Sequence, residues 1–273
     1  MSIKRHIPNF ITCFNLFFGC MAVVFALRGW LFFAVAMVMV AAIFDFCDGL
    51  AARLLRAYSL LGKELDSLAD LISFGLAPAA MVHYEYTQAL SHKISYGAES
   101  VPWELLSFFP FVLAVAAALR LAKFNIDAGQ SDHFRGLPTP AAALLVCAML
   151  VYTTVSPKLL PILHSYWAIP LLSAFVSLLM VSNMPMFSLK IKSLSWSGNQ
   201  IRFLFAAFLL ISIVLAILLG WSWSFTLLLM LSTYIALSLL LWIFVPPPCN
   251  TRQTDERHAD RNTAQREPQS PSP

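Results

Sequence analysis

The sequence predicts an all-α fold, a polytopic helical membrane protein with about eight transmembrane helices. Of its 273 residues, 59% are hydrophobic and 12% are charged, and the mean hydropathy is +0.73. Soluble domains carry about 25% charged residues, so this composition excludes that class. Apolar stretches of about 20 residues can cross the membrane, and helices satisfy their backbone polar groups internally. These stretches are 9–27, 30–48, 66–87, 104–122, 137–155, 167–184, 202–220 and 222–245.

The first apolar stretch follows Lys4 and Arg5, an arrangement that secretory signal peptides share. It is long, however, and ends in "FALRGW" without a convincing small-residue cleavage site. We therefore expect a first transmembrane helix, preceded by a short interfacial segment over residues 1–8.

Four aspartates lie where the second stretch ends and the third begins. Acidic side chains at membrane depth cost about 2.5 to 3.5 kcal/mol each, so the group needs a compensating partner. Asp45 and Asp48 are three residues apart, and Asp66 and Asp70 are four apart, so each pair shares a helix face. The segment between the pairs returns the chain to the same membrane face, so two neighbouring helices can direct all four carboxylates into one cavity.

Two divalent metal ions, Mg²⁺ or Mn²⁺, would neutralise such a cluster, because hard cations prefer carboxylate oxygens. Two metals about 3.5 to 4 Å apart also form a clamp for phosphoryl transfer. No Cys or His joins the set of four at the spacing of the aspartates, which argues against zinc.

Small residues and one arginine accompany the aspartates. Gly49 and Ala52 leave room on the second helix, Gly62 opens the start of the third, and Arg53 offers a fork of donors suited to phosphate. Glycine and alanine in membrane helices also serve helix packing. Their combination with four acids and Arg53 favours a binding site.

The connection between the fourth and fifth stretches lies on the same membrane side as the aspartates. Its sequence, "RLAKFNIDAGQSDHFRGLPTPAAA", is rich in charged residues and ends with glycine and prolines before the next helix. Two interpretations stay open, a segment folded over a site and a basic connection that only marks topology. Its polar residues include Arg120, Lys123, Asn125, Asp127, His133 and Arg135.

We expect one membrane domain over residues 1–200, two additional helices within 201–245 and a disordered cytosolic tail over 246–273. The tail is polar, charged and proline-rich. The cysteines are odd in number and lack metal-ligand spacing, so they resemble small buried hydrophobes.

Basic residues predict the orientation, because Lys and Arg in short loops favour the cytosolic side. This asymmetry places both termini in the cytosol and makes the aspartates face it. The net charge of +4 then reflects membrane topology and does not indicate nucleic-acid binding. One side holds Lys4, Arg5, Arg53, Arg56, Lys63, Arg120, Lys123, Arg135, Lys190, Lys192, Arg202 and the tail arginines, and the other holds Arg28, Lys93 and Lys158.

The pattern D-x2-D-G-x2-A-R-x8-G-x3-D-x3-D, complete from Asp45 to Asp70, resembles the signature of the CDP-alcohol phosphotransferase family. The resemblance implies an integral membrane enzyme, usually a homodimer, with a catalytic core formed by the first six spans. Such an enzyme displaces CMP from a CDP-linked donor with an alcohol as acceptor.

The resemblance also implies roles for individual residues. Asp45, Asp48 and Asp66 would bind metal, and Asp70 would also contact metal and take the proton from the incoming hydroxyl. "PNFIT" resembles the family's Pro-Asn-x-x-Thr entry to the first span. Residues implied to line the CDP or phosphate portion are Asn9, Thr12, Gly49, Ala52, Arg53 and Gly62.

Three further segments, "CFNLFFGCMAVV", "ALRLAKFNIDAG…FRGLPTPAAA" and "LMVSNMPMFSLK", resemble the phosphatidylserine synthase branch of that family. This resemblance covers about residues 8 to 200 and implies CDP-diacylglycerol and L-serine as substrates. A cationic, donor-rich pocket should hold the serine carboxylate. The candidates are Arg120, Asn125 and Arg135, with His133 a weaker one, and the alternatives for these residues are loop charges or contacts to lipid phosphate.

Two other functions stay open. Another branch of the family would use glycerol 3-phosphate or an inositol phosphate as the acceptor, which the basic connection does not exclude by charge. Intramembrane acids also mark the ion pathways of transporters. Against a transporter, all four acids gather at one membrane face and Arg53 lies among them.

Overall fold

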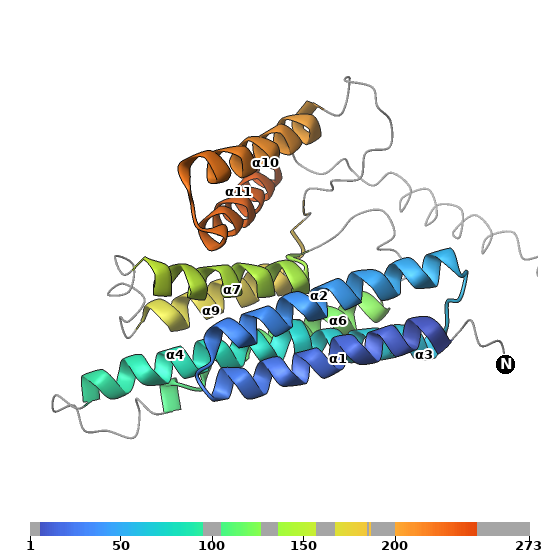
Figure 1. Cartoon of the computed structure of the whole chain (residues 1–273), viewed down its shortest axis with the longest axis horizontal. Coiled ribbons are helices and arrows are strands. Elements are labelled where there is room, and N and C mark those ends of the chain that lie inside the picture. The colour runs from blue at the N-terminus through green and yellow to red at the C-terminus, as the bar shows by residue number, and fades with distance from the viewer. Residues whose placement is uncertain are drawn as a thin grey trace, which may run out of the picture.

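The computed structural model describes residues 6–94, 105–126, 136–156, 167–184, 186 and 200–244. Every regular element in this part of the chain is a helix, which confirms the predicted all-α fold (Figure 1). Arg135, His133 and the tail after residue 244 lie outside the described residues, as do Lys4 and Arg5. The helices are α1 His6–Leu27, α2 Leu31–Leu54, α3 Leu60–Asp70, η2 Leu71–Leu76, α4 Ala77–Ile94, η3 Phe109–Phe111, α6 Val112–Ile126, α7 Thr139–Val155, α9 Ala168–Val181, α10 Gln200–Leu219 and α11 Trp223–Phe244.

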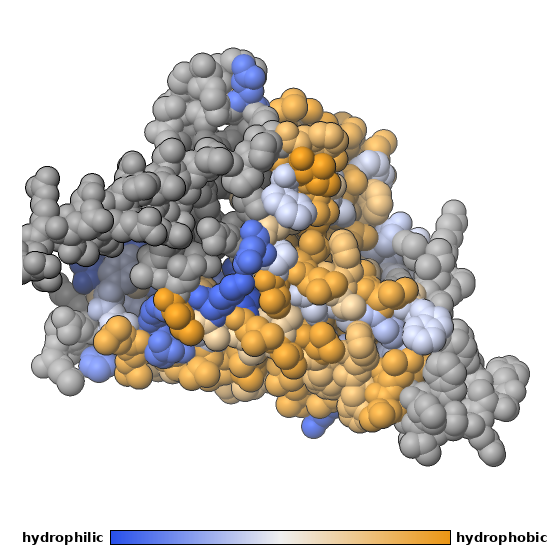
Figure 2. Space-filling model, turned by 180° about the vertical axis from the view of Figure 1, so that it is seen from behind, coloured by the Kyte–Doolittle hydropathy of each residue, from blue (hydrophilic) through white to orange (hydrophobic). Residues whose placement is uncertain are grey.

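Each of the eight expected spans coincides with a helical segment. Five segments are long and apolar enough to cross a membrane: His6–Leu27, Leu31–Leu54, Leu60–Ser91, Phe109–Ile126 and Trp223–Phe244. Three shorter apolar helices cover Thr139–Val155, Ala168–Val181 and Phe203–Leu219. Figure 2 shows that the middle of one face is apolar, with strongly hydrophilic residues mainly on its left side. The chain is therefore an integral membrane protein with several candidate spans.

The two helices that carry the aspartates are longer than the sequence indicated. Helix α2 continues six residues beyond position 48, and α3 begins six residues before position 66. The turn between them contains Arg56 in the left-handed region (φ 49°), and the Ser59 hydroxyl caps α3 by accepting from the Gly62 backbone N–H at 3.0 Å. The expected apolar stretches stopped before Arg53 and began after Lys63 and Glu64, so the helical turns that carry these charges were left out of the prediction. The aspartates consequently lie one or more turns inside their helices.

The segment after Asp70 is a π-helix, η2, which packs against α1 and α6. Two glycines allow this close approach. Gly19 of α1 faces the Ser73 side chain so closely that a Cβ there would collide with it. A Cβ on Gly75 would lie 2.8 Å from the Cβ of Ala117 in α6. The turn that follows Asp70 is thus held between two other helices.

The second half of the molecule continues the bundle. Gly136 and Leu137, which precede α7, donate backbone hydrogen bonds to Met184 O (2.8 Å) and Leu179 O (2.9 Å) at the end of α9. Helix α9 packs on α6, and α11 packs on α7. Helices α10 and α11 form a hairpin beyond α7, so they lie outside the group of helices that carries the aspartates (Figure 1).

Candidate functional site

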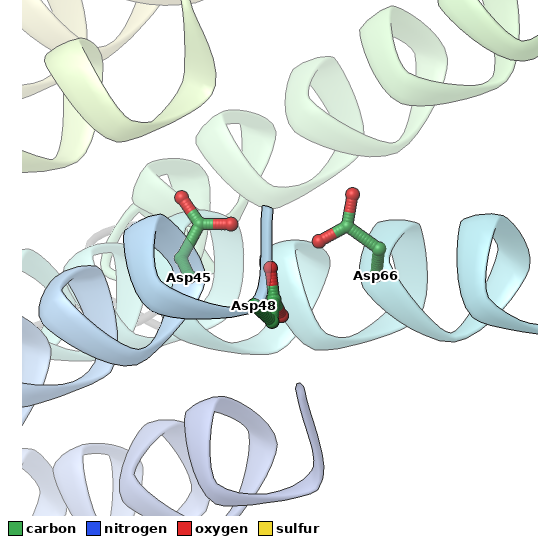
Figure 3. A group of neighbouring side chains, drawn as sticks. All are labelled: Asp45, Asp48 and Asp66. Atoms are coloured by element: carbon green, nitrogen blue, oxygen red, sulfur yellow. The ribbon is translucent and has the colours of Figure 1, made fainter. Parts of the chain in front are cut away.

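Three of the four aspartates form one compact group. Asp45 and Asp48 project from α2 and Asp66 from α3, with the carboxyl groups of Asp45 and Asp66 turned toward each other (Figure 3). One carboxylate oxygen from each lies within 4.8 Å of the other two. Helix α2 packs on α1, and α3 packs on α1 as well, so one helix holds both aspartate-bearing helices in place. The group is buried to half-buried, with Asp48 6% exposed.

The donor set fits a divalent cation. Asp48 Oδ2 and Asp66 Oδ1 are buried and have no hydrogen-bond partner in the described part of the chain. Buried charged oxygens without partners are strongly destabilising, and a bound cation is the usual compensation. Because the ligands are all carboxylate oxygens, the site suits a hard cation and not zinc.

Asp70 lies beside this group. Its carboxyl group lies against that of Asp45. Its Oδ1 accepts a hydrogen bond from Asn15 Nδ2 of α1, at 3.4 Å. The Arg120 guanidinium of α6 lies within electrostatic reach of the same carboxyl group. Four helices, α1, α2, α3 and α6, therefore meet around Asp70.

A cavity of about 210 Å³ opens next to the aspartates, between α1, α2 and α3. Asp48 and Asp66 form part of its wall, so a ligand in the cavity can reach the carboxylate group directly. Arg53 does not line it, because its side chain is exposed at the end of α2. The other residues predicted to bind the CDP portion do line the cavity. They are Asn9, Thr12, Gly49, Ala52 and Gly62.

The two glycines of this cavity differ in their surroundings. A Cβ on Gly49 would meet no atom within 4 Å, so this glycine keeps space open and is not needed for helix packing. A Cβ on Gly62 would lie 2.8 Å from Asn9 Oδ1 and 3.0 Å from Ser59 Oγ. Gly62 therefore lets the Asn9 side chain approach the first turn of α3.

The residues predicted to hold an acceptor carboxylate are arranged differently from one another. Arg120 Nη1 donates to Thr139 Oγ1 at 2.6 Å, whereas its Nε is buried without a partner in the described residues. The Asn125 carboxamide donates to Ser67 Oγ at 2.9 Å, and the Asn125 backbone oxygen accepts from Lys63 Nζ at 3.1 Å. Asn125 thus joins α6 to α3, and Arg120 keeps a donor available.

Sequence reasoning missed two polar residues near Asp70, namely Asn15 and Ser73. Both are fully buried, and the Ser73 hydroxyl donates to the Asn15 backbone oxygen at 3.0 Å. The available signal was the presence of an asparagine within an otherwise apolar stretch, because polar side chains there are costly unless they have a partner.

Comparisons with known proteins identify the family. The sequence model of the CDP-alcohol phosphatidyltransferase family matches residues 5–180. The CDP-diacylglycerol–serine O-phosphatidyltransferase of Bacillus subtilis is 34% identical over 162 residues, which are 58% of this chain and 81% of that protein. Enzymes of the same name from Helicobacter pylori (36% over 147 residues) and Saccharomyces cerevisiae (35% over 169 residues) match 52% and 55% of this chain. The chain spans 57% and 55% of the length of these two relatives.

Proposed function

Because the chain belongs to the CDP-alcohol phosphatidyltransferase family, we propose that it transfers the phosphatidyl group of CDP-diacylglycerol to L-serine, giving phosphatidylserine and CMP. The observation that carries the proposal is the group of three carboxylates within 4.8 Å, with partnerless buried oxygens, beside a cavity large enough for part of a nucleotide. The names of the relatives from three organisms favour serine over other alcohols.

In this proposal Asp45, Asp48, Asp66 and Asp70 hold two divalent ions, Mg²⁺ or Mn²⁺. Bound there, the ions would neutralise the donor's pyrophosphate and the charge that develops on the CMP leaving oxygen. The aspartates would hold these ions beside the donor's pyrophosphate, and the burial of the aspartates limits competing contact with water.

The transfer step is a displacement at phosphorus. The serine hydroxyl oxygen forms a bond to the phosphorus that bears diacylglycerol, while the bond from that phosphorus to the bridging oxygen of CMP breaks. Asp70 accepts the hydroxyl proton as a general base, because it lies beside the other three carboxyl groups. The partnerless Nε makes Arg120 our candidate for the serine carboxylate, whereas the Asn125 carboxamide already bonds Ser67.

The donor's nucleotide portion would lie in the cavity between α1, α2 and α3, against Asn9, Thr12, Gly49, Ala52 and Gly62. Its acyl chains would stay in the bilayer while serine arrives from the cytosol. The excess of basic residues on the same side as the aspartates supports a cytosolic site and cytosolic termini. A homodimer is expected from the family resemblance.

The test is an acceptor panel with purified protein, CDP-diacylglycerol and Mg²⁺ or Mn²⁺. We expect CMP release with serine and not with glycerol 3-phosphate or inositol phosphate. Asp70→Asn should lower kcat by at least about 100-fold, the usual contribution of a general base, while the tryptophan fluorescence of the folded protein is kept. Product with glycerol 3-phosphate but none with serine would overturn the choice of acceptor, and no CMP release with any acceptor would overturn the transferase.

A further inference from the structure

Asn15 is the polar side chain of α1 that reaches the candidate base. It is 0% exposed, and its Nδ2 donates to Asp70 Oδ1 at 3.4 Å, across 55 positions of sequence. A carboxamide offers donors on one side and an acceptor on the other. Here the donor side faces Asp70.

The other side of this carboxamide is unsatisfied. Asn15 Oδ1 is buried and has no hydrogen-bond partner among the described residues. A buried acceptor without a partner destabilises the folded protein relative to an apolar side chain at the same place. Asn15 is therefore not explained by stability, and its contact with Asp70 is what distinguishes it from the apolar residues around it.

The backbone at Asn15 is fixed to the turn that follows Asp70. Ser73 Oγ of η2 donates to Asn15 O at 3.0 Å, and Gly19, one turn further along α1, leaves room for the Ser73 side chain. Asp70 and Ser73 belong to one continuous helical segment. Two hydrogen bonds therefore join α1 to this segment, one through the Asn15 backbone and one through its carboxamide.

We propose that Asn15 is a positioning residue for the transfer reaction, holding one oxygen of the Asp70 carboxylate so that the other is directed at the acceptor hydroxyl. The inference rests on the proposed role of Asp70 as the base. Proton transfer requires the two oxygens to lie within hydrogen-bond distance, and misplacement by about 1 Å can cost about 100-fold in rate. Asn15 acts through Asp70 and contacts neither substrate.

The test compares Asn15→Ala with wild type, using the full chain in detergent with CDP-diacylglycerol, serine and Mn²⁺. We expect kcat to fall about 10- to 100-fold. The KM values for both substrates should change less than about threefold, because Asn15 contacts neither substrate. The melting temperature should stay within about 4 °C of wild type, because loss of the hydrogen bond to Asp70 Oδ1 is offset by removal of the unsatisfied Asn15 Oδ1.

Two further variants separate positioning from packing. Asn15→Asp keeps the size and shape of the side chain but replaces the donor with an acceptor, so kcat should fall at least as far as in Asn15→Ala. Ser173→Ala removes another buried polar group without a partner, in α9, and should keep the wild-type kcat. Ser173 is 2% exposed and therefore matches the burial of Asn15.

The outcomes are distinct. If Asn15→Asp keeps a kcat within about threefold of wild type, the positioning role is wrong. A lower melting temperature for Asn15→Ala, with both KM values raised in proportion to the loss of kcat, would show a packing role and also overturn the proposal. Absence of CMP release by wild type would instead contradict the proposed function itself.

Discussion

Replacing Asp48 by asparagine should stabilise the metal-free protein. Asp48 is the most buried member of the carboxylate group, and its oxygen lies within 4.8 Å of oxygens of Asp45 and Asp66. Two unit charges at that separation repel by about 3.5 kcal/mol at an effective dielectric constant of about 20. Asp48→Asn removes two such pairs while keeping the side-chain shape.

The full Coulomb value is an upper bound, because solvent and relaxation screen it. We expect a gain of about 2 kcal/mol in the free energy of unfolding, which raises the melting temperature by about 4 to 8 °C for a domain of this size. Bound metal should reverse the order, because it stabilises wild type more than Asp48→Asn. At about 100 times its Kd, a bound ion stabilises wild type by about 2.7 kcal/mol, and Asp48→Asn should lose most of that gain.

Thermal unfolding of the detergent-purified protein, followed by tryptophan fluorescence, measures both the gain without metal and the loss of metal stabilisation. The chain contains seven tryptophans. Each variant is melted in chelator and across a Mn²⁺ titration. Glu64→Gln is the matched control, because it removes a carboxylate from the same helix as Asp66 at an exposed position. A Mn²⁺ shift in Asp48→Asn as large as in wild type would refute the metal assignment. Equal stability of the two proteins in chelator would refute the repulsion argument.

Three more substitutions test the surroundings of the site. Gly62→Ala should raise the KM for CDP-diacylglycerol about 3- to 10-fold, because its Cβ would lie 2.8 Å from Asn9 Oδ1 and displace that side chain. Gly49→Ala should keep or raise the melting temperature, since its Cβ meets nothing within 4 Å, and a melting temperature lower than that of Gly62→Ala would contradict this account. Asn125→Ala should lower stability by about 1 kcal/mol, or about 2 to 4 °C, through loss of the 2.9 Å bond to Ser67. The KM for serine should stay unchanged, and a tenfold rise without a melting shift would assign Asn125 to the acceptor pocket.

Local periodicity is why so much of the fold could be predicted from the sequence. Each span is a continuous apolar stretch, so its hydropathy identifies it without knowledge of the other spans. The spacing of Asp45 and Asp48 places both on one face of α2 whatever packs against it. Predicting that the aspartate-bearing faces of α2 and α3 meet required one further assumption. The chain between the two helices had to be short and to return to the same side of the membrane.

The same reasoning does not predict hydrogen bonds between residues that are distant in sequence. Asn125 and Arg120 both lie near the end of α6 and both are polar, so composition assigned them one role. In the structure Asn125 bonds Ser67 of α3, and Arg120 keeps its Nε free of any partner among the described residues. Arg53 belongs to the family pattern and yet is exposed, whereas its neighbour Ala52 lines the cavity.

Asn15 shows what separates a predictable residue from an unpredictable one. The α-helical period alone does not predict which residues of the third span face Asn15, because η2 changes the register of every side chain after Asp70. The Ser73 hydroxyl lies within η2 and donates to the Asn15 backbone oxygen, and Gly19 leaves room for the Ser73 side chain. A π-helix has no reliable sequence pattern, so the contact could not be derived from spacing. The sequence does show an amide side chain within an apolar helix, and the free-energy cost of burying that amide indicates that it has a hydrogen-bond partner on another helix.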